Sequence, residues 1–209
     1  MSLKIYATQS RGYTPTPEGS HIARCFRVID LGTQDTEYQG NRTERPQVLL
    51  QWVLLDDETG KPVITRRYNA SLHPQSVLRK DLEAWVGKIN TAFSLASLLN
   101  KPCLLAISYN RMDNYIKTNV AGVSSVPQNL EVPPLPAKYT PLFFDLSSPD
   151  RAIFETLPFR MREDILKSKE VRTNRELYNF LTAPKKTGDG SKPKPSLFNS
   201  LLQRLVGGN

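Results

Sequence analysis

The sequence predicts a mainly β fold with helical additions: a five-stranded OB-fold barrel with a helix between strands 3 and 4, followed by a helical C-terminal extension. Three observations predict this class. Three strand-like segments come first, a segment with helical periodicity follows them, and two further strand-like segments come after it. A five-stranded Greek-key barrel of the OB type fits this order. Another small β-barrel and a two-layer α+β domain also fit it, and both stay open.

The first three strands are predicted from runs of apolar, β-branched and aromatic residues that end at turn residues. They are expected at residues 21–32, 47–56 and 62–72. The middle run is apolar on both faces, which is typical of a central strand. The polar segment 33–46, with Gly40 and Asn41 at its tip, is expected to be a loop. The three strands should form an antiparallel meander.

The helical period begins after Pro74, which suits a first helical turn because that position needs no backbone N–H. Leu78, Leu82 and Trp85 form one apolar stripe. Gly87 is the expected end of this helix. A second short helix and the last two strands are expected at residues 94–100, 101–110 and 114–126.

The composition changes several times beyond the barrel. Residues 127–141 hold five prolines, which indicates an extended strap, and short helices are expected within 143–170 and at 174–181. We therefore divide the chain into an N-terminal arm at 1–20, an OB-fold domain at 21–126, a Pro-rich strap and helical extension at 127–183, a flexible basic linker at 184–195 and a C-terminal amphipathic helix at 196–209.

The expected C-terminal helix has an apolar face that could bind a partner. Its residues are Leu197, Phe198, Leu201, Leu202 and Leu205. The spacing of four residues places the leucines on one side of a helix. This helix could dock on its own barrel or on a neighbouring copy, so a homo-oligomer stays open. It could equally bind in a groove of a replication or recombination protein.

The charge balance indicates the kind of partner. The formal net charge is +8 and the sequence pI is about 9.5, which favours a polyanion. No apolar run approaches the ~20 residues that a membrane span needs. The first residues also lack the apolar core of a signal peptide. We therefore expect a soluble cytoplasmic protein with no membrane partner.

The residues that enzymes use are sparse. The two histidines, His21 and His73, do not have metal-ligand spacing, and no phosphate-binding loop or nucleophile motif occurs. Cys25 and Cys103 lie in apolar strand-like runs and are expected to be buried thiols. We therefore expect no catalytic residues, no metal and no cofactor.

Arginine and aromatic side chains are instead frequent on the expected strands and loops. Proteins bind single-stranded nucleic acid through a basic groove that follows the phosphates and through aromatic rings that stack on bases. The candidates are Arg24, Arg27, Tyr38, Arg42, Arg45, Arg66, Arg67, Tyr68, Tyr109, Arg111, Tyr115 and Lys117. They fall on the strands and loops that form the binding face of an OB fold.

Strand alternation separates some of these candidates. Arg66 and Tyr68 should share one face of their strand, and Arg67 should point to the other face or a rim. We interpret Arg66 and Tyr68 as the pair that faces the ligand. The alternatives are that the tyrosine packs in the core and that each arginine is a solvated surface residue.

Three segments, "ARCFRVIDLGTQDTEYQG", "LHPQSVLRKDLEAWVGK" and "LLNKPCLLAISY", together resemble a family of phage and prophage proteins. The family is that of OB-fold single-stranded-DNA-binding, replication-associated proteins. The resemblance covers residues 19–126 and, more weakly, the segment from "FFDL" to "ILKSKE". It implies a location in the bacterial host cell. Many bacterial and phage single-strand binders end in an acidic tail, whereas "LLQRLVGGN" contains no acid.

We therefore expect a protein that binds single-stranded DNA, or RNA, largely independently of sequence. It would neutralise phosphates and stack on bases during phage DNA replication or recombination. One alternative is a protein–protein interaction adaptor or defence-related factor that uses the barrel and the C-terminal helix. A second alternative is a virion structural barrel.

Overall fold

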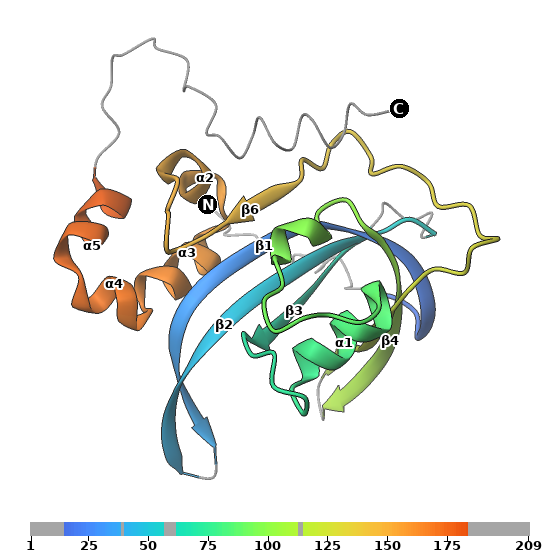
Figure 1. Cartoon of the computed structure of the whole chain (residues 1–209), viewed down its shortest axis with the longest axis horizontal. Coiled ribbons are helices and arrows are strands. Elements are labelled where there is room, and N and C mark those ends of the chain that lie inside the picture. Colours follow the sequence, from blue (N-terminus) through green and yellow to red (C-terminus); the bar gives the residue numbers. More distant parts are fainter. Residues whose placement is uncertain (1–14, 39, 57–61, 113–114, 184–209) are drawn as a thin grey trace, which may run out of the picture.

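A computed structural model describes residues 15–38, 40–56, 62–112 and 115–183. Its centre is a six-stranded sheet with the order β3-β2-β1-β4-β5, and β6 pairs with β1 (Figure 1). The strands are β1 (Gly19–Tyr38), β2 (Asn41–Leu54), β3 (Val63–Asn69), β4 (Pro102–Met112), β5 (Tyr115–Ser124) and β6 (Leu142–Phe144). All pairings are antiparallel except that of β6 with β1. The prediction of a mainly β fold with helical additions is confirmed.

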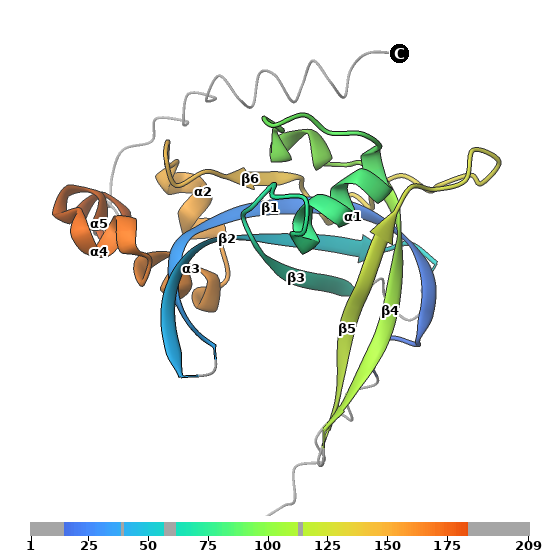
Figure 2. The ribbon, with the colours of Figure 1, turned by 60° about the horizontal axis from the view of Figure 1, so that its bottom comes forward.

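The sheet is strongly curved but open (Figure 2). Strands β3 and β5 form its two ends, and no ladder between described residues joins them. The predicted closed barrel is therefore not confirmed. The expected antiparallel meander of the first three strands is confirmed, because β2 pairs with both β1 and β3.

The predicted loop at 33–46 is wrong. Strand β1 continues to Tyr38 and β2 begins at Asn41, so this segment forms the outer part of a long hairpin. Its pairing is regular from Gly32 opposite Gln47 to Tyr38 opposite Asn41. The hairpin projects beyond the core, and its β2 side is exposed from 41 to 46. This part of the hairpin contains few apolar residues, so its sequence pattern predicts a loop.

One face of the sheet carries α1 (Val77–Val86) and the short 3₁₀ helix η1 (Leu95–Leu98). Helix α1 begins after Ser76, whose side chain accepts a hydrogen bond from Arg79 N, and it ends at Gly87 with φ 85°. The predicted apolar stripe is confirmed, since Leu78, Leu82 and Trp85 are buried. They pack in the main core with Trp52 and with the thiols of Cys25 and Cys103, which are buried as expected.

The C-terminal extension covers the other face. Strand β6 lies parallel to β1, and four short helices follow it: α2 (Arg151–Thr156), α3 (Phe159–Leu166), α4 (Lys169–Thr173) and α5 (Arg175–Thr182). Phe154, Ile165 and Val171 pack against Ile29 and Leu31 of β1 in a second core. The strand β2 is thus buried on both faces, as its sequence predicts, because Leu50 faces the main core and Leu49 the second one.

Gly32 allows this second layer to approach β1. It has φ +69° at an irregularity in the pairing of β1 with β2. A Cβ atom here would lie 2.6 Å from Ser168 Cβ and 2.7 Å from Leu146 Cδ2. Only glycine has both the conformation and the space that this position requires.

Several expectations concern other parts of the chain. The linker 184–195, the helix 196–209 with its partner-binding residues, and residues 1–14 of the arm lie outside the described residues. In the part of the chain that is described, no helix has the length and apolar character needed to cross a membrane.

Candidate nucleic-acid interface

Arg66 and Tyr68 lie on the same side of β3, and both contact Asp81 of α1. Tyr68 Oη donates to Asp81 Oδ2 at 2.8 Å, and Arg66 Nη1 donates to the same oxygen at 2.9 Å. The Arg66 guanidinium lies 4.8 Å from the centre of the Tyr68 ring, a cation–π distance. The predicted pairing of these two residues on one face is confirmed.

The predicted stacking role of Tyr68 is corrected by its burial. The residue is 4% exposed and belongs to the main core. Burial, followed by the negative charge of Asp81, raises the pKa of the Tyr68 hydroxyl well above its ordinary value. The ring therefore anchors α1 to β3 and does not present a face on which a base could stack.

Arg67 points to the opposite side of β3, as strand alternation predicts. Its guanidinium forms an ion pair with Asp164 of α3 and donates to Gln47 Oε1 at 3.3 Å. The adjacent arginines therefore hold two different helical layers against the same edge strand, and each is paired with a carboxylate.

A hollow of about 640 Å³ opens around the C-terminal end of β3, and we call it the β3–α1 pocket. Residues from both faces of the strand line it because the strand ends there. Its lining consists of Arg45, Gln47, Arg66, Arg67, Tyr68, Asn69, Ser71, His73, Gln75, Ser76, Val77 and Leu78. Four of the predicted site residues thus meet in one pocket: Arg45, Arg66, Arg67 and Tyr68.

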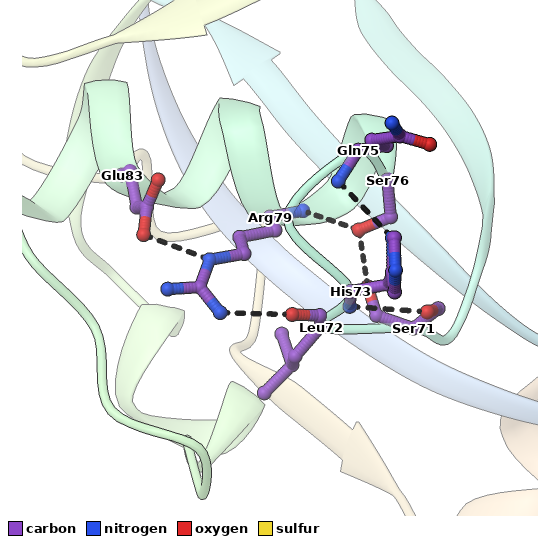
Figure 3. Close-up of polar contacts among 7 residues, drawn as sticks. All are labelled: Ser71, Leu72, His73, Gln75, Ser76, Arg79 and Glu83. Atoms are coloured by element: carbon purple, nitrogen blue, oxygen red, sulfur yellow. Dashed lines mark hydrogen bonds and ion pairs between the residues drawn. The ribbon is translucent and has the colours of Figure 1, made fainter.

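One wall of the pocket is the loop between β3 and α1, which its own hydrogen bonds hold in place (Figure 3). Ser76 Oγ donates to Ser71 O at 2.6 Å, and Arg79 Nη1 donates to Leu72 O at 3.0 Å. His73 Nδ1 accepts from Gln75 N at 3.2 Å, so the proton of a neutral ring belongs on Nε2. The loop therefore presents a donor, His73 Nε2–H, from an exposed side chain.

Four residues of the pocket wall are not among the predicted site residues: Ser71, His73, Gln75 and Ser76. The sequence predicts the first helical turn at Pro74, but the helix begins only after Ser76, so Pro74 lies in this loop. The loop becomes a pocket wall only because α1 folds back over β3. The only sign of this wall in the sequence is the turn between β3 and α1, which places polar side chains directly after the Arg-rich strand.

The positive charges in the pocket are not all compensated. Asp81 pairs with Arg66, and Asp164 pairs with Arg67. Arg45 is exposed and makes no ion pair with a described side chain. An anion that enters this pocket would therefore meet Arg45 as its first uncommitted cation.

Two hairpins extend to the same side of the molecule, one toward each end of β3 (Figure 2). The β1–β2 hairpin carries Arg42 and Arg45, and the β4–β5 hairpin carries Arg111 and Lys117. All four side chains are exposed, and none forms an ion pair with a described residue. Glu37 lies directly opposite Arg42 and offsets part of its charge.

Alternation along β4 and β5 distinguishes the two faces of their hairpin. Tyr109 and Arg111 follow buried Ile107 on one face, and Lys117 falls on the other face with Asn119. The Tyr109 ring is partly exposed, and its backbone N–H donates to Glu18 Oε1 at 2.7 Å. An aromatic and a cationic residue, Tyr109 and Arg111, therefore lie on the face of β4 that also carries the buried Ile107.

The roles expected for Arg24 and Arg27 are corrected. Arg24 donates to the carbonyl oxygens of Asn100 at 2.7 Å, Pro133 at 2.7 Å and Val132 at 3.3 Å. Burial lowers the pKa of its guanidinium. It therefore fixes the Pro-rich strap to β1.

Arg27 is likewise held within the fold. Its guanidinium donates to Gln51 Oε1 at 3.3 Å and lies 5.0 Å from the centre of the Phe26 ring. Burial lowers its pKa too. The predictions for Tyr38 and Tyr115 concern side chains outside the described part of the chain.

No group of three or more His, Cys, Asp or Glu side chains in the described part of the chain could hold a metal ion. No protein-family model matches the sequence, and no curated protein is significantly similar to it. The pocket and the two hairpins are therefore the features that bear on function.

Proposed function

We propose that the protein binds single-stranded DNA, largely independently of sequence, along the open side of the sheet between its two hairpins. The observation that supports this most strongly is that both hairpins carry exposed cations that pair with no described acidic side chain. They are Arg42 and Arg45 on one hairpin, and Arg111 and Lys117, on opposite faces, on the other. A strand that follows this side would meet positive charge at both ends of β3.

The expected mechanism is mainly electrostatic. Each Arg or Lys that contacts a phosphate releases counterions from the nucleic acid, which gives affinity without sequence preference. Tyr109 is the candidate stacking residue, because its ring is partly exposed beside Arg111. A stacked base contributes about 1–3 kcal/mol whatever its identity. In this mechanism Tyr68 stabilises the fold, and Tyr109 stacks on a base.

The strand order supports an OB-type fold. Strand β1 pairs with both β2 and β4, and α1 lies between β3 and β4 in the chain. In a closed barrel of this order β5 would pair with β3, and these strands already approach each other in the open sheet. We propose that this is an OB barrel opened between β3 and β5, which widens the side where the hairpins project.

The biological role follows from the resemblance to phage single-strand binders. We propose that the protein protects or organises single-stranded DNA during phage replication or recombination. The preference for DNA over RNA has the same basis. The exposed cations by themselves fit either polyanion.

Binding of labelled oligo-dT measured against salt tests the proposal. The oligonucleotide should be longer than the ~16 nucleotides that one OB fold covers at most. We expect binding at about 50 mM salt that weakens steeply as salt rises, with a log–log slope of about −0.7 for each phosphate contacted. No binding to micromolar protein at this salt concentration would contradict the proposal. Matched oligo-rU and duplex DNA report whether the preference is for DNA and for single strands.

A further inference from the structure

A second hollow lies among the C-terminal helices, on the other side of β1 from α1. It has a volume of about 410 Å³ and is lined by residues of α2, α3 and the end of α5, and we call it the α3–α5 groove. Its lining consists of Phe154, Glu155, Phe159, Arg162, Glu163, Leu166, Leu181, Thr182 and Ala183. The proposed DNA-binding side does not use any of these residues.

One aromatic side chain of the groove lining is largely exposed to solvent, and two more are exposed on the neighbouring helix α5. Phe159 is 67% exposed, and Tyr178 and Phe180 are each 46% exposed. All three lie on α3 and α5. Among the described residues, these are the only aromatic side chains that are large, hydrophobic and exposed. Phe159 is the one of the three that lines the groove, and an exposed apolar side chain at the edge of an apolar hollow marks an interaction surface.

The position of the groove indicates what occupies it. Ala183 lines the groove and is the last described residue, and 26 residues of the chain follow it. The linker 184–195 has twelve residues, and a flexible chain of that length spans about 20 Å on average. The segment that begins at Ser196 is therefore tethered at the mouth of the groove. Such a tether gives an effective concentration on the order of millimolar.

The chemistry of that segment matches the groove. Leu197, Leu201 and Leu205 recur every four residues, the pattern by which an amphipathic helix enters an apolar groove. Its low charge suits an apolar groove. The segment 196–206 has Arg204 as its single charged residue, and the groove lining holds Glu155, Glu163 and Arg162, with Glu155 paired with Arg151.

We propose that residues 196–206 bind in the α3–α5 groove of the same chain as an amphipathic helix. Phe159, Leu166 and Leu181 would then pack against its leucines. The groove and the proposed DNA-binding side share no residue, so this inference can fail while the proposed function holds.

Photo-crosslinking in the full chain tests this inference. The photoreactive p-benzoylphenylalanine replaces Phe198, and crosslinked peptides are identified by mass spectrometry. We expect crosslinks within one chain to peptides from 154–183, with a yield that does not change over a hundredfold dilution. Phe159→Glu should reduce that yield at least fivefold. Leu130→Glu is the matched control, because Leu130 is also an exposed apolar residue, 40% exposed, but lies in the strap. It should leave the yield unchanged.

Three outcomes would overturn the inference. Crosslinks only between chains, lost on dilution, would assign the groove to a second copy. Crosslinks to other elements, or none, would show that the segment does not use the groove. Equal effects of Phe159→Glu and Leu130→Glu would show that the contact does not depend on Phe159. Circular dichroism of both variants verifies that each one folds.

Discussion

Tyr68 Oη and Arg66 Nη1 donate to the same oxygen of Asp81, at 2.8 Å and 2.9 Å. Asp81 is the residue through which α1 holds two side chains of the edge strand β3. The carboxylate is 14% exposed and the Arg66 side chain 20%. An ion pair at this depth is worth more than an exposed one, and losing one partner leaves the other charge poorly solvated.

Tyr68→Phe should therefore reduce stability and leave DNA binding almost unchanged. The variant loses a hydrogen bond to a charged acceptor, which costs about 1.5–3 kcal/mol. Urea unfolding measures the loss, and titration with oligo-dT measures binding. Tyr109→Phe is the control, since no hydrogen bond of the Tyr109 hydroxyl to a described residue is found. Weaker binding by Tyr68→Phe at unchanged stability would contradict the assignment of Tyr68 to the core.

Tyr109→Ala should weaken binding of oligo-dT by about 1–3 kcal/mol, the contribution of one stacked base. Tyr109→Phe keeps the aromatic face and should bind as the wild type does. Fluorescence polarisation with labelled oligo-dT measures both variants. If the two substitutions have equal effects, the ring does not stack on a base.

Gly32→Ala should destabilise the protein by about 3 kcal/mol, from left-handed strain and from overpacking against the second layer. Gly40→Ala separates the two causes, because Gly40 also has positive φ, +76°, but a Cβ there meets nothing within 4 Å. Its cost should be only the strain, about 1 kcal/mol. Thermal unfolding of both variants measures the difference. Equal losses would show that close packing at Gly32 adds nothing.

The contact between the β1–β2 hairpin and α4 should contribute to stability in a pH-dependent way. Glu170 accepts hydrogen bonds from Thr33 Oγ1 at 2.6 Å and from Thr33 N at 2.8 Å. Desolvation by itself would raise the pKa of Glu170, but these hydrogen bonds outweigh it and hold the pKa below its ordinary 4.5. A lowered pKa in the folded state means that the ionised carboxylate stabilises the fold above about pH 4.5 and that this contribution is lost as the pH falls.

The wild type should accordingly be more stable than Glu170→Gln at pH 7, and the difference should shrink as the pH falls below 4.5. Urea unfolding at a series of pH values measures it. A difference that stays constant from pH 7 to pH 3 would show that the charge of Glu170 does not contribute.

The sequence predicted the elements whose pattern is local. The stripe of Leu78, Leu82 and Trp85 has a helical period, and the apolar run of β2 has the composition of a buried strand. The outer hairpin was missed because alternation needs a buried face, and the ribbon at 33–46 has little of one. The four helices of the extension were predicted only in outline, since their shared core with β1 forms across more than a hundred residues.

In the candidate site, too, the local features could be predicted and those set by tertiary packing could not. Alternation correctly separated Arg66 and Tyr68 from Arg67, because it depends only on strand geometry. It could not reveal what covers each face, so it placed Tyr68 on an open surface instead of beneath α1. Arg24 was misassigned for a related reason. Its acceptors are backbone carbonyls of Asn100 and Pro133, which leave no trace in the pattern of side chains.

The most direct measurement is the salt dependence of oligo-dT binding by the wild type, by the double variant Arg45→Ala/Arg111→Ala and by Arg160→Ala. Arg160 is exposed on α3 and belongs to neither hairpin, so it serves as the control. Loss of two phosphate contacts should make the log–log slope of the double variant about 1.4 less steep than that of the wild type, and Arg160→Ala should leave it unchanged. A double variant with the wild-type slope, or equal effects of the double variant and Arg160→Ala, would contradict the claim that the two hairpins hold the DNA.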